Sequence, residues 1–175
     1  LWGMGRNHAG QIGDGTNTDQ ASPVKVVNSG VAEVASGLSH GYYLTTSGDL
    51  WAMGWNADGQ LGDGTVTNRN SPVQVLNGSD VSQVSAGSKE GYFIKEDGTA
   101  WAMGRNDFGQ LGNADTADQS TPAIVFGWEE NASVSVARFV SNGLVTLGNA
   151  IYCVGGYNSS NVYKLLEKYD HQTGQ

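Results

Sequence analysis

The sixteen residues LWAMGWNADGQLGDGT, at positions 50–65, have close copies at positions 1–16 and 100–115. The copies read LWGMGRNHAGQIGDGT and AWAMGRNDFGQLGNAD, and residues 1–26 share 16 identities over 26 positions with residues 50–75. All 3 methionines and all 3 prolines of the chain fall in the same register. The chain therefore contains an internal repeat of about 50 residues. A motif that recurs once per repeat indicates scaffold rather than a catalytic centre, because a catalytic centre is usually built once.

Composition restricts the class of protein. The 175 residues carry 26 glycines without a Gly-X-Y period, which excludes collagen and indicates many tight turns. The net charge is −8 and the 9 Lys and Arg residues do not cluster, so nucleic acid is not expected as the main partner. No apolar run is long enough to span a membrane. A single cysteine, Cys153, allows neither an intrachain disulfide nor a thiolate metal cage.

One repeat predicts four short strands. PVQVL from Pro72 and VSQVSAG from Val81 have strand patterns, and GYFIKEDGTAWAMG forms a hairpin that turns at Asp97-Gly98, with positive φ expected at both turn residues. No segment shows helical periodicity. Four antiparallel strands every 50 residues are typical of a β-propeller blade, so the predicted fold is all-β.

The repeated motif can be assigned structural roles within such a blade. Its glycines are expected where strands end and the chain crosses between blades. Trp51 and Met53 share one strand face, which predicts packing between blades. Asp63 is expected to form a turn, and Pro72 to start an outer strand, where a missing N–H does no harm.

The pattern W-x-x-G-x-N-x-x-G-Q-L-G-x-G, followed by x-x-x-P-x-x-V and V-x-x-V-x-x-G, resembles the regulator of chromosome condensation repeat. Here it reads WAMGWNADGQLGDG, SPVQV and VSQVSAG, and the resemblance covers residues 1–126. It implies a ring of seven blades with repeats of about 50 residues. It also implies binding of other macromolecules through propeller faces and loops.

Residues 127–175 resemble a different repeat, the kelch repeat. Ile151-Tyr152, Gly155-Gly156 and Tyr169-Asp170 with Thr173 carry this resemblance, which implies another four-stranded blade. The chain is thus expected to hold three to four blades of a seven-bladed type of ring. Leu1 lies partway through a repeat, so we expect an open arc that depends on missing blades from a longer parent chain.

No catalytic, metal or cofactor site is predicted. His8, His40 and His171 lack metal-ligand spacing, and in the related family a histidine at the position of His40 is structural. Asp14 and Asp63 lack the alternating spacing of a calcium loop and are interpreted as turn formers. Cys153 is interpreted as a core residue.

Positions that change between repeats, within a frame that does not, are the candidates for recognition. The frame consists of the asparagines and glutamines at matching positions: Asn7, Asn56, Asn106, Gln11, Gln60 and Gln110. The variable positions lie in predicted loops, and those chosen as candidate partner-binding residues are Arg6, His8, Trp55, Asp58, Arg105, Asp107 and Phe108. A second variable set, Leu38-Ser39-His40 against Ser88-Lys89-Glu90, could face the same side. The alternative is that the loop aromatics cover neighbouring blades.

Three functions fit these features. The first is a protein-interaction scaffold without catalysis. The second is a carbohydrate-binding or cell-surface module of a larger secreted protein, which suits the loop aromatics and the acidic, Asn-, Gly- and Thr-rich composition. The third is a fragment of a kelch-type oxidase with copper, which lacks matching copper histidines here. The composition favours an extracellular setting but a cytoplasmic one stays open, and the sequons at Asn77, Asn131 and Asn158 matter only for a secreted chain.

Overall fold

The computed structural model describes residues 1–75 and 80–125 in full, and residues 144–147, 150–154 and 166–170 by their backbone. Every regular element in these ranges is a β-strand, which confirms the all-β prediction. The strands in chain order are β1 (Trp2–Gly5), β2 (Gln20–Lys25), β3 (Val31–Ser36), β4 (His40–Thr45), β5 (Leu50–Gly54), β6 (Arg69–Gln74), β7 (Val81–Ala86), β8 (Glu90–Lys95), β9 (Ala100–Gly104), β10 (Gln119–Ile124), β11 (Leu144–Leu147), β12 (Ala150–Val154) and β13 (Leu166–Asp170).

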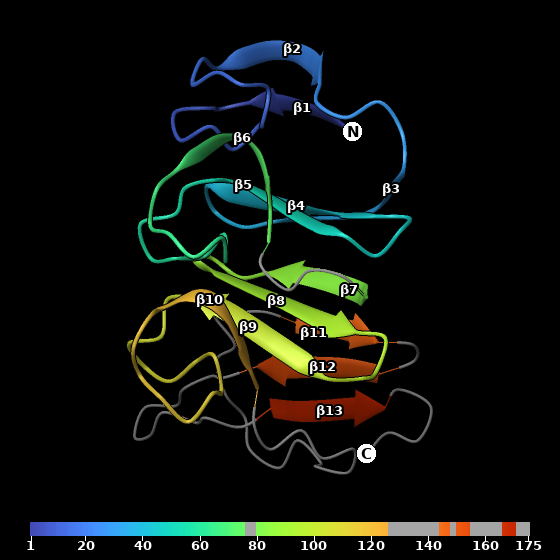
Figure 1. The fold of residues 1–175 in the computed structure, drawn as a ribbon, viewed down its shortest axis with the longest axis vertical. Helices are drawn as coiled ribbons and strands as arrows, with labels where there is room; N and C mark the ends of the chain where they lie inside the picture. The colour runs from blue at the N-terminus through green and yellow to red at the C-terminus, as the bar shows by residue number, and fades with distance from the viewer. Residues whose placement is uncertain (76–79, 126–143, 148–149, 155–165, 171–175) are drawn as a thin grey trace.

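The strands form four antiparallel sheets that follow one another along the long axis of the molecule (Figure 1). We call them the first blade (β1–β2), the second blade (β3–β6), the third blade (β7–β10) and the fourth blade (β11–β13). Strands that are consecutive in the chain are neighbours in every sheet, so each blade is a meander. The predicted four-stranded repeat is therefore confirmed in the second and third blades.

The outermost strand of each complete blade carries the repeat proline. Pro72 lies in β6, an edge strand, where the pairing with β5 shifts between Ala52 and Gly54. The equivalent Pro122 lies in β10, where the pairing with β9 shifts in the same way. A residue without an N–H is tolerated there because no ladder hydrogen bond is lost. The outer position of Pro72 is thus confirmed, but the prediction that Pro72 starts the strand was wrong, because β6 begins at Arg69.

The core lies between the blades. Tyr42, Leu44, Leu50 and Ala52 alternate along β4 and β5 and present one face of the second blade to the third blade. The third blade packs against this face with buried residues that include Val84, Phe93 and Met103. Because strand side chains alternate between the two faces of a sheet, every second residue of a blade can be buried against its neighbour. Met103 lies in this core, and the equivalent Met53 is buried beside Gly13 of the first-blade loop, which agrees with the inter-blade packing that the sequence predicts for Met53.

Cross-strand aromatic pairs reinforce the two complete blades. Tyr43 pairs with Trp51 in the register, and their rings stack with centroids 6.1 Å apart. Phe93 and Trp101 repeat this arrangement at 6.3 Å. Stacked pairs of this kind add about 0.5–1.5 kcal/mol beyond their buried area.

The hairpin turn differs in one detail from the prediction. The amide of Gly98 donates to the carbonyl of Lys95, and Gly98 has a φ of 83°. Asp97 does not have a positive φ. The loop is therefore a three-residue connection with a single left-handed glycine, not a two-residue turn with two left-handed positions. The prediction of positive φ at Asp97 was wrong because Asp-Gly suits both turn types.

The kelch-like segment contains a hairpin. β11 pairs with β12, with Leu144 opposite Cys153, and β13 follows on the other side of β12. Cys153 therefore lies on the central strand of its sheet. The expectations for its side chain, for His171, for Gly155-Gly156 and for the three sequons fall outside the described residues. The division of the chain at residue 126 stays a prediction.

Candidate functional site

The repeated loop after the third strand of a blade is organised around a buried asparagine. The side-chain oxygen of Asn56 accepts from the amide of Leu61 at 2.9 Å, and its Nδ2 donates to Asp63 Oδ1, Thr65 O and Thr67 O at 3.0–3.2 Å. Asn7, Asn56 and Asn106 are all fully buried. A side chain with both donors and an acceptor in use fixes the loop as firmly as a short piece of secondary structure.

The other polar side chains of the motif, Gln60 and Asp63, form further hydrogen bonds within the same loop. The side-chain oxygen of Gln60 accepts from the amide of Asp58 at 3.1 Å. Asp63 accepts from the amide and hydroxyl of Thr65, and its other oxygen accepts from Arg69 at 2.7 Å. Burial opposes the charged form of Asp63, but these hydrogen bonds outweigh it and lower the pKa of the carboxyl. The carboxylate is therefore engaged in the turn, as the sequence predicts.

Two glycines of the loop let each blade touch the next. Gly59 has a φ of 78°, and a Cβ on it would lie 2.6 Å from the Cα of Ser120 in the third blade. The amide of Gly64 donates to the carbonyl of Ser120 at 2.9 Å. The first-blade loop makes the equivalent contact with the second blade, where the amide of Gly15 donates to the carbonyl of Asn70 at 2.8 Å. The motif LWAMGWNADGQLGDGT therefore builds the blade and joins it to the next one, and the frame that recurs in each repeat is scaffold.

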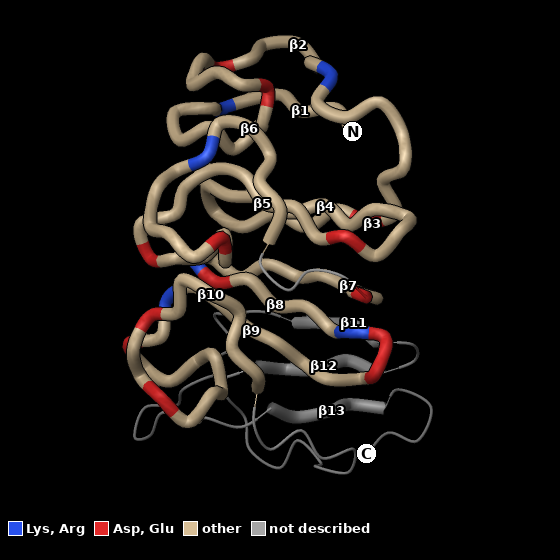
Figure 2. The backbone as a smooth tube through the Cα atoms, in the orientation of Figure 1, with Lys and Arg blue, Asp and Glu red and all other residues tan. Residues whose placement is uncertain are grey.

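The variable positions lie on the outside of this frame. We call the group that surrounds the boundary of the second and third blades the loop face, and it consists of Trp55, Asp58, Lys89, Arg105, Asp107 and Phe108. The β3–β4, β5–β6, β7–β8 and β9–β10 connections meet at this end of the blades, since the strands alternate in direction. Figure 2 shows basic and acidic residues side by side at the start of β8 and the end of β9.

Charges on the loop face are paired. Lys89 Nζ lies 3.4 Å from Asp58 Oδ1, which joins the third blade to the second. Arg105 Nη2 lies 2.5 Å from Asp107 Oδ2. The Arg105 guanidinium also lies 6.0 Å from the centre of the Phe108 ring. Asp107 raises the pKa of Arg105 through its hydrogen bond and its charge, so the guanidinium stays charged.

A buried layer lies below the loop face. Glu90 accepts from the amide of Lys89 at 3.0 Å and from Gln110 Nε2 at 3.2 Å, and burial raises the pKa of its carboxyl. His40, at the equivalent position one blade earlier, is 2% exposed and donates from Nε2 to the Glu90 carbonyl at 3.3 Å. Burial lowers the pKa of His40 to about 4. The structural role expected for His40 agrees with this setting.

The predicted recognition residues are divided between two places. Asp58, Arg105, Asp107 and Phe108 come together at the boundary of the second and third blades. Trp55 is 37% exposed and Phe108 57% exposed, so both aromatics have a free surface.

Arg6 and His8 belong instead to the first blade. Arg6 lines a groove there, and His8 is exposed with its Nδ1 3.3 Å from Gln11 Nε2. Lys89 was not among the predicted site residues, although the change from Ser39 to Lys89 between repeats is the signal that finds it. The description of these residues as partner-binding stays a prediction.

Neither a metal centre nor a membrane helix is found in the part of the chain that the structure describes. No three His, Cys, Asp or Glu side chains gather there in a way that could hold a metal ion. Among the same residues, no helix has the length and apolar character required to cross a bilayer.

The chain belongs to the family of regulator of chromosome condensation (RCC1) repeat proteins. Residues 1–44, 47–90 and 97–138 match the family model of that repeat, and a second model of the repeat matches residues 31–60 and 81–110. Residues 138–175 match the Kelch motif. Both predicted resemblances are therefore confirmed. A comparison with curated proteins gave no match.

Solved structures share the fold. Human WBSCR16 has 21% identity and a TM-score of 0.67, over 95% of this chain and 46% of that one. Prp20p from Saccharomyces cerevisiae, described with its binding properties to Gsp1p and histones, has 20% identity and a TM-score of 0.60, over 73% and 34%. Yeast RCC1 (Prp20) bound to Kap60 has 19% identity and a TM-score of 0.60, over 73% and 32%. This chain spans less than half of each structure, and the prediction of a partial propeller is confirmed.

Proposed function

We propose that this chain is a protein-interaction scaffold that binds a protein partner through the loop face and catalyses no reaction of its own. The observation that carries the proposal is the exposed Phe108 beside the Arg105 guanidinium, 6.0 Å from the ring centre. Aromatic and arginine side chains contribute most of the binding energy at protein interfaces. A partner that covers both would remove apolar surface from water and shield a charge pair at once.

The loop face is held rigidly, which favours binding. The amide of Phe108 is fixed by Gln110 Oε1 at 2.9 Å, and the amide of Asp58 by Gln60 Oε1 at 3.1 Å. Below them, Asn106 is fully buried in its own hydrogen-bonded loop. A preorganised surface loses little conformational entropy on association, so more of the contact energy appears as affinity.

The charge on this surface favours a protein partner with both signs of charge. Lys89 and Arg105 each have a carboxylate neighbour, Asp58 and Asp107. A net charge of −8 disfavours a polyanionic partner such as nucleic acid.

Related structures support binding in general, without naming a partner for this chain. The yeast relative is described with binding properties to Gsp1p and histones, and in a structure bound to Kap60. Since fold does not fix function, we carry over protein binding and none of these partners. We also infer that the missing blades of a longer parent chain complete the arc.

A carbohydrate ligand is the second candidate, favoured by the free surface of Trp55. Sugars stack on the faces of aromatic rings, and Trp55 is the exposed tryptophan of the loop face. The ring of Phe108, however, already has the Arg105 guanidinium as a neighbour. Quenching of tryptophan fluorescence by a panel of sugars, lost in Trp55→Phe, would favour this alternative.

The experiment for a protein partner is photo-crosslinking from the loop face. A photoreactive phenylalanine analogue replaces Phe108 in the intact protein inside its own cells. A matched protein carries the analogue at Val66, which is 61% exposed on the β5–β6 loop. We expect a discrete crosslinked protein from position 108 and none, or a different set, from position 66.

Alanine variants then test whether the crosslinked partner depends on the loop face. Trp55→Ala/Phe108→Ala should reduce its capture by roughly tenfold or more, which corresponds to about 1.4 kcal/mol or more. Val66→Ala should leave the capture unchanged. Equal capture by the double variant and by wild type, with equal thermal melting, would rule out the loop face as the interface.

A further inference from the structure

Glu90 lies directly beneath the loop face, and its carboxylate joins two residues of that face. Glu90 begins β8 and is 2% exposed. Its Oε2 accepts from the amide of Lys89 at 3.0 Å, and its Oε1 accepts from Gln110 Nε2 at 3.2 Å. Gln110 Oε1 in turn accepts from the amide of Phe108 at 2.9 Å. A single carboxylate therefore holds Lys89 directly and Phe108 through one side-chain amide.

Gln110 has its two polar atoms committed in opposite directions. Its nitrogen only donates and its oxygen only accepts, and the side chain is buried, which excludes solvent as a substitute partner. If this amide turned over, Nε2 would face the N–H of Phe108 and two donors would meet. The orientation of Gln110, and with it the hold on Phe108, therefore depends on an acceptor at Glu90 Oε1.

The link to a carboxyl group is a feature of the third blade. In the second blade, Gln60 accepts from the amide of Asp58 just as Gln110 accepts from the amide of Phe108. At the position of Glu90, however, the second blade has His40, whose Nε2 bonds to the Glu90 carbonyl of the next blade. The hold on the loop backbone is thus common to both blades, whereas its connection to a titratable carboxyl belongs to the loop that carries Phe108.

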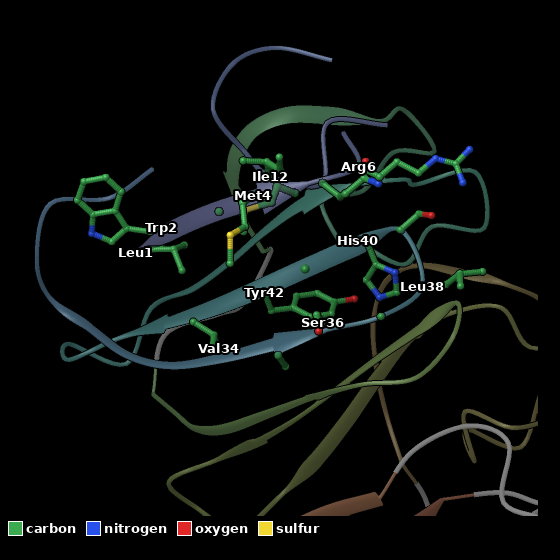
Figure 3. A pocket seen from close by; sticks show the side chains of 17 residues that line it. Leu1, Trp2, Met4, Arg6, Ile12, Val34, Ser36, Leu38, His40 and Tyr42 are labelled. Atoms are coloured by element: carbon green, nitrogen blue, oxygen red, sulfur yellow. The ribbon is translucent and has the colours of Figure 1, made fainter. Parts of the chain in front are cut away.

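Charged and titratable groups surround Glu90 from both blades. From the third blade they are Lys89 and Arg105, and from the second blade they are His40, Tyr42 and Asp58. Figure 3 shows His40 and Tyr42 next to each other on β4, and their rings meet edge to face with centroids 5.3 Å apart.

These neighbours leave Glu90 as the group that titrates first when the pH falls from neutral. Burial is the main cause that raises the pKa of Glu90 above 4.5, and the charge of Asp58 adds to it, against hydrogen bonds and Arg105 that lower it. Burial lowers the pKa of His40 to about 4. The Tyr42 hydroxyl, with its pKa raised well above 10, stays neutral.

We propose that Glu90 is a proton-responsive positioning residue of the loop face, which holds Phe108 while its carboxylate is ionised and frees it on uptake of one proton. The proton comes from solvent and turns one carboxylate oxygen into an O–H donor. The Lys89 amide and Gln110 Nε2 then compete for the single remaining carbonyl oxygen. The Lys89 amide is joined to Glu90 through the chain and stays within reach, so Gln110 loses its partner.

The inference rests on the proposed function, because it treats Phe108 as a partner-binding residue. A partner that binds Phe108 in its held position prefers the ionised form of Glu90. By proton linkage, a partner that binds only this form loses about tenfold in affinity at about one pH unit below the Glu90 midpoint. Arg105 keeps its own carboxylate neighbour, Asp107, so the change falls on the aromatic residue.

The test follows the backbone amides of Lys89 and Phe108 by NMR on the full chain, from neutral pH to about pH 4. We expect both amide resonances to shift with one common midpoint above 4.5, because one group controls both. In Glu90→Gln neither amide should titrate with that midpoint. In Gln110→Met, which removes the polar atoms between them, Lys89 should still titrate with that midpoint and Phe108 should not.

Two results would overturn the proposal. The first is a wild-type Phe108 amide that stays unchanged while that of Lys89 titrates, and this curve decides even where a variant fails to fold. The second is a Phe108 titration that persists in Glu90→Gln, which would assign it to the adjacent Asp107.

The partner identified by crosslinking from position 108 gives a separate readout. Its affinity for wild type should fall about tenfold at about one pH unit below the midpoint, and its affinity for Gln110→Met should not follow that midpoint. Constant affinity for wild type across the midpoint also overturns the inference. Absence of any partner at neutral pH contradicts the proposed function instead, and the NMR titration still decides whether Glu90 controls Phe108.

Discussion

Ala114 holds the left-handed backbone conformation that Gly15 holds two repeats earlier, with a φ of 61° against 83°. The motif ends in GDGT in the first two repeats and in GNAD in the third, so alanine stands where the loop needs positive φ. An L-residue in this region costs about 1–2 kcal/mol, because its Cβ approaches the following carbonyl oxygen. The loop geometry of the repeat has outweighed the preference of the residue.

Replacing Ala114 by glycine should therefore stabilise the chain by about 1 kcal/mol, less the added freedom of glycine in the unfolded state. Gly15→Ala is the reverse experiment. A Cβ there would lie 3.7 Å from the hydroxyl of Ser71, an ordinary contact, so its cost measures the backbone alone. Urea unfolding midpoints should shift upward for Ala114→Gly and downward for Gly15→Ala. A downward shift in both variants would show that the methyl of Ala114 contributes packing.

The buried asparagine of the loop should tolerate no change of charge. Asn56→Asp keeps the shape of the side chain but replaces the Nδ2 donor by an oxygen acceptor. That oxygen would face Asp63 Oδ1 and two backbone carbonyls, which are also acceptors. Lost hydrogen bonds and a desolvated charge should cost about 3 kcal/mol or more in the free energy of unfolding. Chemical denaturation checks this. Asn28→Asp, at an exposed position, is the control and should change the free energy by less than about 0.5 kcal/mol.

The sequence predicts the repeated parts of this molecule well, because each of those residues acts within its own blade. The strands, the turn role of Asp63 and the outer place of Pro72 all follow from local spacing. What the sequence could not supply depends on contacts between blades. Lys89 joins the site through Asp58, which lies in another blade.

A single repeat pattern also cannot distinguish Val34 from Val84. The two residues have the same place in the motif, and only the presence of a covering strand decides their exposure. The same holds for Arg6 and Arg105, which share a position in the repeat but lie beside a groove and an aromatic ring, respectively. Sequence reasoning therefore grouped seven recognition residues that the fold separates.

His40 and Glu90 should give opposite contributions to the pH dependence of stability. Burial lowers the pKa of His40 from 6.5 to about 4, so the unfolded chain binds this proton first as the pH falls. The stability linked to His40 is complete above pH 6.5 and is lost as the pH falls toward about 4, by up to about 3 kcal/mol. Burial raises the pKa of Glu90 above 4.5, so its contribution is present below 4.5 and is lost as the pH rises through the folded value.

Two variants without a titrating side chain separate these contributions. With urea unfolding measured at several pH values between 4.5 and 6.5, His40→Gln should lose less stability on acidification than wild type. Glu90→Gln should lose more, because the opposing proton uptake by the folded state is gone. The slopes with pH, not the absolute stabilities, carry the result. Parallel curves for all three proteins would mean that neither group titrates differently in the folded chain.

Val34 and Val84 provide the last prediction, which compares identical truncations at equivalent positions. Val84→Ala removes two buried methyl groups between the second and third blades and should cost about 2 kcal/mol, from the lost burial and the cavity left behind. Val34→Ala, at a position 58% exposed, should cost less than about 0.5 kcal/mol in the chain alone. Equal costs for the two truncations in urea unfolding would mean that Val34 is as well covered as Val84 in solution, against the difference in their exposure.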